Sequence, residues 1–486
     1  MAELRLPAKK TKIVCTIGPA SESRETLERL IENGMNVARL NFAHGDFESH
    51  KAVIDNVREA QAVLGQRVAI MGDLPGPKMR IGRLAGESAQ LERGQPFILQ
   101  TDDTLGDGRH ASMSFAGLPQ AVKPGDKIFI NDGLLLLRVE RVEGKKVHCK
   151  VLVGGELRSH KGVNLPGIDL GICAFTARDR EFLEFASEQG LDAISQSFVQ
   201  NASDIEAVRQ AAAALNYHPF IIAKIERSRA VENLDSILES TDGVMVARGD
   251  LGVEIPIEEV ALAQKQIIRR SNLYGKPVIT ATHMLESMIS HRRPTRAEAT
   301  DVANAIFDGT DCLMLSGETA AGCYPVESVA VMARIAQVTE PHAATHDVVR
   351  RLERTQAQEQ ISTEDLISLS IFATAKALTP AAIVAPTLSG ATARRVSRFR
   401  LPVWIVAVSP EESTCQALQF SHGVYPVLET DRPASWTRYA YDWLKGHGVP
   451  GDLALLTRGS ATFHAGGTNH IEIVDLRCPP DEVSIW

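Results

Sequence analysis

The segment FIIAKIER, residues 220–227, places a cation and an anion two positions apart in an otherwise apolar run. The apolar residues predict a buried strand, and residues two apart in a strand point to the same face. Lys224 and Glu226 are therefore expected on one face of this strand. The next strand-like segment, DGVMVARGD, ends in Asp250, so a second carboxylate is expected near Glu226. A lysine beside two carboxylates can hold a divalent cation together with an anionic substrate.

The pair Glu226 and Asp250 offers only oxygen donors. Two nearby carboxylates repel unless one is protonated or a cation lies between them. Because no His or Cys accompanies them in the sequence, the pair favours Mg²⁺ or Mn²⁺ over zinc. A general acid and base pair of the glycosidase kind is the alternative, and the adjacent Lys224 argues against it. A lysine near a metal and an arginine suits phosphate oxygens, although neither a Gly-x-x-x-x-Gly-Lys-Ser/Thr loop nor a Gly-x-Gly-x-x-Gly motif occurs.

Strand-like runs that alternate with helix-like runs are expected to position these residues. Three strand-like runs precede residue 75 and five follow residue 167. Eight βα units over about 250 residues suggest a closed (β/α)₈ barrel, with an open doubly wound sheet as the alternative. In a barrel the active site lies at the carboxyl ends of the strands. Polar residues expected there are Arg39, Asn41, Asp73, Ser197, Lys224, Glu226, Asp250, Thr282 and Ser316.

Two further domains are predicted from changes in this pattern. Residues 75–166 hold short β-like runs divided by Gly, Pro and Asp turns, which predicts a small β-rich insertion. It enters after the third strand, where it could close over the barrel mouth as a lid. A polar stretch begins near residue 341, and alternation resumes after it. The predicted domains are a barrel of residues 1–74 and 167–344, the lid, and a C-terminal α/β domain of residues 345–486.

Composition predicts an ordinary soluble protein. Apolar residues make up 44% of the chain, charged residues 23%, and the formal net charge is −8, so neither a nucleic-acid nor a membrane partner is expected. Seven scattered cysteines without a Cys-x-x-Cys motif argue against a disulfide framework and for a reducing compartment. No signal-peptide core and no run of about 18 apolar residues is present, so we expect a cytoplasmic protein. The histidines at 50, 110, 218 and 470 are expected on the surface.

Long stretches of the chain resemble pyruvate kinase. The segments that carry the resemblance, in order, are TIGPAS, NVARLNFAHG, KGVNLPG, IIAKIE, VARGDLGVEIP, TATHMLESM and RPTRAEATDVANAIFDGTDCLMLSGETAAGCYPVE. The resemblance covers essentially the whole chain. It implies a (β/α)₈ TIM barrel with an inserted small β-barrel domain and a C-terminal α/β regulatory domain. It also implies transfer of the phosphoryl group of phosphoenolpyruvate to ADP, giving pyruvate and ATP as the last step of glycolysis.

The resemblance assigns roles to single residues. Lys224, Thr282 and Arg39 match catalytic residues, with Lys224 touching the transferring phosphoryl group and Arg39 binding phosphate. Glu226 and Asp250 match the ligands of Mg²⁺, for which Mn²⁺ could substitute. The substrate contacts implied are Arg39, Lys224, Gly249, Asp250 and Thr282, and the nucleotide contacts are His44, Arg80 and Lys161.

One region departs from the family pattern. Many members need K⁺ as well as Mg²⁺, and their K⁺ ligands match Asn41, Asp73 and positions 43 and 74. This chain has Ala43 and Leu74 there, and neither offers a side-chain oxygen. It also has Lys78 where K⁺-dependent members carry glutamate. We therefore expect a bacterial-type enzyme of the K⁺-independent kind, in which the Lys78 ammonium replaces the ion; the alternative is a Lys78 that points to solvent.

A loop in the C-terminal part matches the family's site for a phosphorylated allosteric effector. Its candidate residues are Thr387, Ser389, Gly390 and Thr392, at the start of a predicted helix, where backbone amides favour an anion. Leu388 stands where bisphosphate-responsive members often have lysine. A sugar monophosphate or an AMP-like activator is therefore expected, with an ordinary capped helix as the alternative. The family also implies a homotetramer.

Two other functions stay open at this point. A Mg²⁺-dependent barrel lyase acting on a 2-oxo acid would share the carboxylate pair but would need neither a lid nor a C-terminal domain. A catalytically inactive regulatory paralogue is the second alternative. The presence of Lys224, both carboxylates and Thr282 argues against it.

Overall fold

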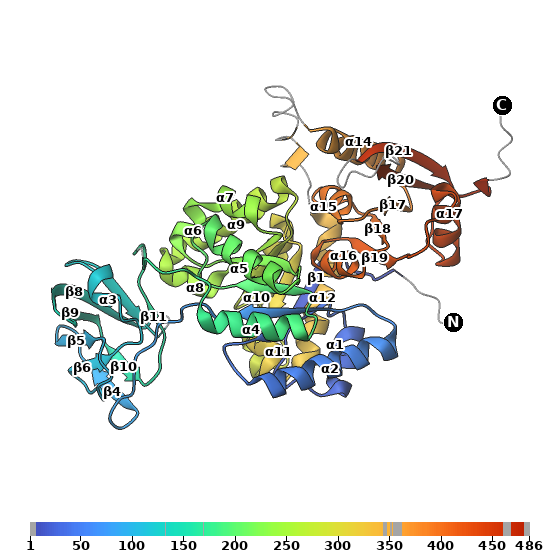
Figure 1. Cartoon of the computed structure of the whole chain (residues 1–486). Coiled ribbons are helices and arrows are strands. Elements are labelled where there is room, and N and C mark those ends of the chain that lie inside the picture. The colour runs from blue at the N-terminus through green and yellow to red at the C-terminus, as the bar shows by residue number, and fades with distance from the viewer. Residues whose placement is uncertain are drawn as a thin grey trace.

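The computed structural model describes residues 6–131, 133–168, 170–343, 348–349, 352, 362–459 and 468–480. Figure 1 shows three parts side by side, with the barrel in the middle. The β-rich insertion projects from one end of the barrel, and the C-terminal α/β part packs against the other.

Eight parallel strands form a closed barrel in the order β1-β16-β15-β14-β13-β12-β3-β2. Strand β1 pairs with both β16 and β2, which closes the ring. The strands are β1 (Lys12–Thr16), β2 (Val37–Asn41), β3 (Ala69–Leu74), β12 (Ala193–Gln196), β13 (Phe220–Ile225), β14 (Gly243–Ala247), β15 (Val278–Ala281) and β16 (Cys312–Leu315). The predicted barrel is confirmed, and the open sheet is excluded.

Helices surround the barrel because its strands are apolar on both faces. The larger core lies between strands and helices and contains Leu27, Ile54 and Leu183, while a second core inside the barrel contains Val14, Met71 and Met245. The helices are α1 (Arg24–Glu32), α2 (Phe47–Leu64), α4 (Ala177–Glu188), α5 (Ala202–Ala214), α6 (Ser228–Glu232), α7 (Leu234–Ser240), α8 (Arg248–Glu254), α9 (Val260–Tyr274), α10 (Arg296–Asp308), α11 (Gly317–Ala320) and α12 (Pro325–Thr339). None of the described helices is long and apolar enough to cross a bilayer.

The insertion between β3 and α4 is a curled sheet with a core of its own. Its six strands are ordered β11-β7-β8-β9-β5-β6, and β10 and β4 form a separate ladder. The elements are β4 (Ser88–Leu91), β5 (Pro96–Gln100), β6 (His110–Ser112), α3 (Leu118–Ala121), β7 (Lys127–Ile130), β8 (Leu135–Glu143), β9 (Lys146–Val153), β10 (Gly155–Arg158) and β11 (Val163–Asn164). The predicted β-rich character of this part is confirmed.

Two chain segments join the insertion to the barrel, and barrel side chains hold both. In the first, the Gly76 amide donates to Asp179 Oδ1 at 3.0 Å. In the second, Arg227 Nη2 donates to the carbonyls of Leu165 and Ile168, each at 3.3 Å. The two segments also pair with each other at Arg80 and Gly162. The base of the insertion is therefore anchored to helix α4 and to the end of β13.

The C-terminal part is an α/β layer with a five-stranded sheet ordered β19-β18-β17-β20-β21, as the alternation predicts. Strands β19 to β20 run parallel, and β21 runs antiparallel to β20. Its elements are α14 (Thr363–Leu378), β17 (Ala382–Pro386), α15 (Ala391–Ser397), β18 (Trp404–Ser409), α16 (Glu412–Ala417), β19 (Val424–Leu428), α17 (Trp436–Gly446), β20 (Leu453–Gly459) and β21 (Thr468–Asp475). Most of the polar stretch from residue 344 to residue 361 lies outside the described residues.

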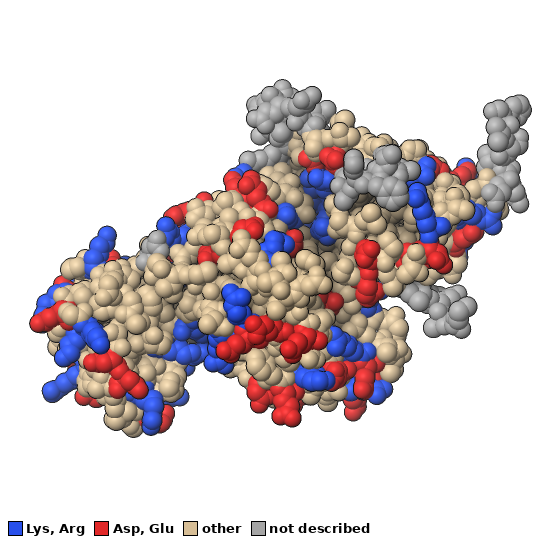
Figure 2. Space-filling model, in the orientation of Figure 1, with Lys and Arg blue, Asp and Glu red and all other residues tan. Residues whose placement is uncertain are grey.

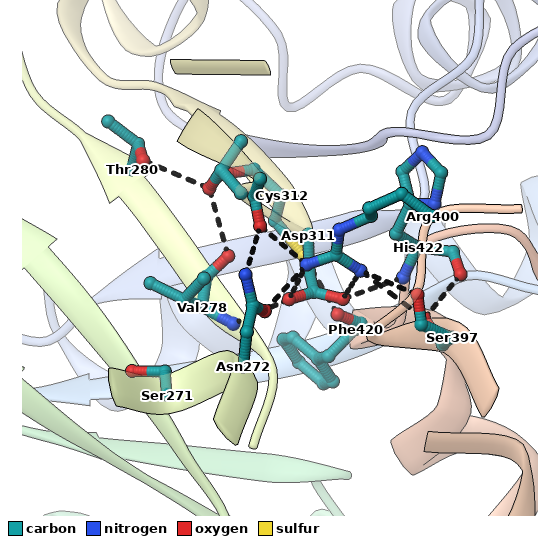
Figure 3. Close-up of polar contacts among 12 residues, drawn as sticks. Ser271, Asn272, Val278, Thr280, Asp311, Cys312, Ser397, Arg400, Phe420 and His422 are labelled. Atoms are coloured by element: carbon teal, nitrogen blue, oxygen red, sulfur yellow. Dashed lines mark hydrogen bonds and ion pairs between the residues drawn. The ribbon is translucent and has the colours of Figure 1, made fainter. Parts of the chain in front are cut away.

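The C-terminal part closes the amino end of the barrel. Phe420 stacks on Phe220 of β13, with ring centroids 5.3 Å apart, and joins the core inside the barrel. Beside it, the Arg400 guanidinium donates to both oxygens of Asp311 at 2.9 and 2.8 Å and to Asn272 Oδ1 at 2.9 Å (Figure 3). The open mouth of the barrel is therefore at the carboxyl ends of the strands.

One surface prediction is wrong. His50 is 9% exposed rather than on the surface. It packs edge-on against Phe42, with centroids 5.1 Å apart, and its Nε2 lies 2.9 Å from the His44 carbonyl oxygen. His50 lies in the first turns of α2, on the buried face of that helix. Elsewhere, acidic and basic side chains are interspersed over the visible face (Figure 2).

Candidate active site

Lys224 lies between two carboxylates at the barrel mouth. Its Nζ is 3.5 Å from Asp73 Oδ1 and 3.4 Å from Glu226 Oε2, and it donates to Ser197 Oγ at 2.6 Å. Burial by itself lowers the pKa of Lys224, but the charges of Asp73 and Glu226 outweigh burial and raise it. The lysine is therefore held as a cation at neutral pH. The predicted placement of Lys224 and Glu226 on one face is confirmed.

Only one of the two carboxylate oxygens of Glu226 accepts a hydrogen bond from the described residues. Its Oε1 accepts from the Phe198 amide at 2.6 Å, whereas its buried Oε2 has no hydrogen bond within the described residues. Burial raises the pKa of Glu226 to about 7, with Lys224 opposing the shift and Asp250 adding to it. A cation between Glu226 and Asp250 would oppose this shift, because a nearby positive charge favours the ionised carboxylate.

Asp73 joins the two cations of the site. Arg39 Nε donates to Asp73 Oδ2 at 2.9 Å, and Arg39 Nη2 contacts the same oxygen. Burial raises the pKa of Asp73, but Lys224 and Arg39 overcome burial and lower it. Asp73 and Arg39 each have a further hydroxyl partner that no spacing in the sequence predicts. Ser195 Oγ donates to Asp73 Oδ1, and Arg39 Nη1 donates to Thr16 Oγ1, both at 2.8 Å.

Thr282 and Gly249 meet at the ends of β15 and β14, and β14 is the direct neighbour of the strand that carries Lys224. Thr282 directly follows β15, and its Oγ1 accepts from the Gly249 amide at 2.7 Å while donating to the Ala281 carbonyl at 2.7 Å. Asp250 is exposed and lies in the first turn of α8, not at a strand end, because that helix begins directly after β14. Gly249 and Thr282 are thus in contact, and Asp250 directly follows Gly249.

The predicted nucleotide residues lie around the base of the insertion. His44 follows β2, and burial together with Lys78 and Arg80 lowers its pKa. Arg80 Nη1 donates to the His160 carbonyl at 2.9 Å, and the Lys161 carbonyl accepts from the Ile81 amide at 2.9 Å. Arg80 and Lys161 are therefore on paired segments.

The residues of the altered monovalent-cation region differ in burial and in hydrogen bonding. Asn41 Oδ1 accepts from the Ala43 amide at 3.2 Å, Leu74 is fully buried, and Lys78 is exposed. Among the residues that the structure describes, none of the hydrogen bonds or ion pairs of Asn41 or Asp73 involves Lys78.

The predicted effector residues lie between the end of β17 and the first turn of α15. The Gly390 amide donates to Thr387 Oγ1 at 3.0 Å, with a Gly390 φ of 75°. Arg394 Nη2 donates to the Ser389 carbonyl at 2.7 Å, and the hydroxyls of Thr392 and Thr468 share a hydrogen bond. Residues 460–467, which precede Thr468, lie outside the described residues.

A separate cavity of about 1480 Å³ lies at the opposite end of the barrel. Lys12 and Ile70, near the amino ends of β1 and β3, line it together with Tyr425 and Trp443 of the C-terminal part. It contains none of the predicted site residues.

A closed (β/α)₈ barrel whose mouth holds a lysine, an arginine and a carboxylate pair defines a class of enzymes that act on anionic substrates with a divalent cation. The family model "Pyruvate kinase, barrel domain" matches residues 8–329, and "Pyruvate kinase, alpha/beta domain" matches residues 365–474. The chain belongs to the pyruvate kinase family.

Similar proteins span nearly the whole chain. It is 46% identical over 476 residues to the pyruvate kinase of Thermococcus litoralis, covering 97% of this chain and 100% of the relative. It is 45% identical over 475 residues to that of Geobacillus stearothermophilus, covering 96% and 80%. It is 42% identical over 474 residues to that of Clostridium acetobutylicum, covering 96% and 99%. The chain is accordingly a phosphotransferase that forms pyruvate and ATP from phosphoenolpyruvate and ADP, and nothing favours the lyase or the inactive paralogue.

Proposed function

We propose that Lys224, Arg39 and Thr282 are the catalytic residues of this pyruvate kinase. The observation that carries the proposal is the buried cluster in which Asp73 and Glu226 keep Lys224 charged at the barrel mouth. Phosphoryl transfer depends on positioning and charge neutralisation more than on covalent chemistry. Lys224 and Arg39 offer two fixed positive charges to the oxygens of the transferring group.

Glu226 and Asp250 are the proposed ligands of Mg²⁺ or Mn²⁺. The fit is supported by the buried Glu226 Oε2, which lacks a hydrogen bond in the described part of the chain, and by the raised pKa of Glu226. The described residues contain no group of three His, Cys, Asp or Glu suited to a metal ion. Mg²⁺ would therefore take further ligands from substrate and water, as it commonly does. When bound, it supplies Lewis-acid stabilisation of the enolate oxygen.

Gly249 and Thr282 are the proposed contacts of the substrate carboxylate. The Gly249 amide and the Thr282 hydroxyl already face each other at 2.7 Å. An anion bound here would replace this hydrogen bond and accept from both groups. The enolate carbon must then be protonated, and Thr282 with a water molecule is the proposed source of the proton.

The nucleotide is proposed to lie between the barrel mouth and the insertion, beside His44, Arg80 and Lys161. Burial lowers the pKa of His44, and the nearby charges of Lys78 and Arg80 lower it further. Two cations beside His44 suit phosphate groups. Residues 75–166 would then act as the lid over the barrel of residues 1–74 and 167–344.

The catalytic proposal is tested with Lys224→Met. Loss of a charged transition-state contact costs about 3–4 kcal/mol, or about two to three decades in kcat, with substrate binding nearly intact. The assay follows pyruvate formation with phosphoenolpyruvate, ADP and Mg²⁺. Lys51→Met is the matched control, because Lys51 forms an exposed pair with Asp55 on α2 and its loss should leave kcat unchanged. Turnover of Lys224→Met within a few-fold of the parent removes Lys224 from this role.

We also propose that the enzyme works without K⁺. Members of the family normally use Mg²⁺ and K⁺, but Ala43 and Leu74 remove two oxygen donors, and Leu74 is fully buried. Lys78 is proposed to supply the positive charge once substrates are bound. The rate is measured in K⁺-free buffer at constant ionic strength with a tetraalkylammonium salt. A tenfold or greater rise on adding K⁺ contradicts the proposal, and the variant Lys78→Glu with Ala43→Ser and Leu74→Thr is expected to gain K⁺ dependence.

Residues 345–486 are proposed to be regulatory. Thr387, Ser389, Gly390 and Thr392 lie between the end of β17 and the first turn of α15, a place that suits the phosphate of a sugar monophosphate or an AMP-like activator. Titrating glucose 6-phosphate, AMP and fructose 1,6-bisphosphate against the phosphoenolpyruvate saturation curve tests this. A shift with the bisphosphate alone contradicts the preference.

We also propose that the enzyme is a homotetramer and that it works in the cytoplasm. Ile257 and Leu262 are 73% and 68% exposed near the start of α9, which supports burial against another subunit. Light scattering coupled to size exclusion measures the mass, and a monomer at micromolar concentration contradicts it.

A further inference from the structure

The Arg248 side chain contacts the segment that follows β15. Arg248 is the first residue of α8, directly before Gly249 and Asp250. Its Nη2 donates to the Thr282 carbonyl at 2.7 Å and to the His283 carbonyl at 3.4 Å, and its Nε donates to the Ala281 carbonyl at 3.3 Å. One guanidinium thus binds three consecutive carbonyls.

Two outer helices fix the same guanidinium from the other side. Its Nη1 lies 2.7 Å from Asp301 Oδ2 of α10 and donates to Gln264 Oε1 of α9 at 3.3 Å. Gln264 is itself held, because its Nε2 donates to Asp308 Oδ2 at 3.0 Å. The Arg248 side chain is only 12% exposed. A planar fork with five donors suits this set of acceptors, and a lysine ammonium does not.

The segment that Arg248 holds has an unfavourable backbone. Thr282 and His283 both have positive φ angles, 69° and 54°. Left-handed backbone is uncommon for non-glycine residues and is an outlier for a β-branched one such as threonine. Such conformations persist where surrounding contacts over-determine them, and they occur often at functional sites. Here the conformation turns the Thr282 hydroxyl toward the Gly249 amide, 2.7 Å away.

We propose that Arg248 is a positioning residue for phosphoryl transfer, which holds Thr282 in its left-handed conformation and thereby fixes the Thr282 hydroxyl against Gly249. This inference rests on the proposed role of Thr282. Arg248 joins the two sides of the substrate carboxylate site, because its backbone leads into Gly249 and its side chain binds the Thr282 carbonyl. It does not itself touch the substrate.

Arg248→Ala is expected to lower kcat about 100-fold, the size of effect that a misplacement of about 1 Å produces. The KM for phosphoenolpyruvate is expected to rise. The KM for ADP is expected to stay unchanged, because His44, Arg80 and Lys161 lie on other segments. A general loss of structure would change both KM values together.

A double-mutant cycle between Arg248→Ala and Thr282→Ala tests the proposal. If Arg248 acts through Thr282, its removal costs only about threefold or less once the Thr282 hydroxyl is absent. Additive losses overturn the inference while leaving the role of Thr282 intact. Turnover of Thr282→Ala equal to that of the parent overturns both, and the two failures are therefore distinguishable.

Three further variants separate positioning from folding. Arg248→Lys keeps the charge without the fork and is expected to stay at least tenfold slow, and recovery to the parent rate contradicts the proposal. Arg209→Ala is the matched control, since Arg209 also binds a carbonyl and a carboxylate, Ser240 O at 2.8 Å and Asp242 at 3.2 Å, before β14. Its kcat should equal that of the parent. If Arg248→Ala does not fold, Asp301→Asn is tested instead, because it removes the carboxylate that pairs with the Arg248 guanidinium. A kcat of Asp301→Asn equal to that of the parent would then count against the inference.

Discussion

Asp73 balances two buried cations, and this balance allows a charged cluster to lie at the bottom of the barrel mouth. Arg39 and Lys224 carry the positive charges, and Asp73 and Glu226 the negative ones. Buried charges are costly unless they are paired and hydrogen-bonded. When Glu226 is ionised the four formal charges cancel, and each cation can then face the mouth without an external counter-ion.

Removing the charge of Asp73 is expected to damage stability and activity together. Asp73→Asn keeps the shape but leaves two buried cations with one carboxylate, and breaking a buried pair costs about 3–5 kcal/mol. Turnover is expected to fall about 100-fold because Arg39 and Lys224 lose their common anchor. Ser195→Ala is the control, since it removes one hydrogen bond to Asp73, worth about 1 kcal/mol. Urea unfolding and kcat are measured for both, and equal effects of the two variants would contradict the charge balance.

The sequence predicted part of this cluster because alternation along one strand is a local property. Lys224 and Glu226 face the same way for that reason. The partnership of Arg39 with Asp73 joins two strands that are 34 residues apart, and no spacing rule links a side chain to a partner on another strand. The contacts of Arg248 were missed for the same reason. The burial of His50 was predictable, because His50 lies on the same helix face as Val53, Ile54 and Val57.

At the scale of elements, the Asp179 side chain both caps helix α4 and contacts the start of the insertion. Asp179 Oδ2 accepts from the Thr176 amide at 2.8 Å and from the Thr176 hydroxyl at 2.7 Å, which completes a capping box. Its Oδ1 accepts from the Gly76 amide at 3.0 Å, at the start of the insertion. The start of α4 therefore also anchors one connection of the proposed lid.

Asp179→Ala and Thr176→Ala are expected to separate these tasks. Each removes a cap, which costs about 1 kcal/mol of stability. Only Asp179→Ala also frees the Gly76 amide, so only this variant should raise the KM for ADP, by severalfold. Thermal unfolding and ADP saturation curves are compared. A raised KM in both variants would mean that the cap, and not the Gly76 contact, is what matters for the nucleotide.

Element starts were predictable where the capping chemistry is local. The side chains of Thr176 and Ser362 accept from the amides of Asp179 and Asp365 at 3.1 Å, as threonine and serine commonly do at the start of a helix. Asp250 was placed at the end of a strand, but α8 starts at Arg248 without a loop. A helix of seven residues is too short to give a clear hydrophobic period, and its start was therefore invisible in the pattern.

At the scale of the whole molecule, the C-terminal part is packed into the barrel rather than tethered to it. Lys12 of β1 donates to the Val424 carbonyl of β19 at 2.7 Å, and Arg400 binds Asp311 next to β16. The order of the three parts followed from the sequence, because each has its own rhythm of strands and helices. Their contacts did not, since Lys12 and Val424 are 412 positions apart.

The shifted pKa values of Lys12 and Lys9 predict how the free energy of unfolding changes with pH. Burial lowers the pKa of Lys12 to about 7 and that of Lys9 to about 8, whereas an unfolded lysine has a pKa near 10.4. Between these values the unfolded chain binds more protons than the folded chain, so the free energy of unfolding rises with pH from about 7 to about 10. Each proton contributes at most about 1.4 kcal/mol per pH unit.

Lys12→Met removes one of these protons and is expected to make the rise from pH 7 to pH 9 smaller. The measurement is the midpoint of urea unfolding at pH 7, 8 and 9 for the parent and the variant. Lys51→Met is the control, because Lys51 forms an exposed pair with Asp55 on α2, and such pairs contribute little to stability. Its pH slope should equal that of the parent. A slope in Lys12→Met as steep as in the parent would mean that Lys12 keeps its proton at the junction of the folded protein.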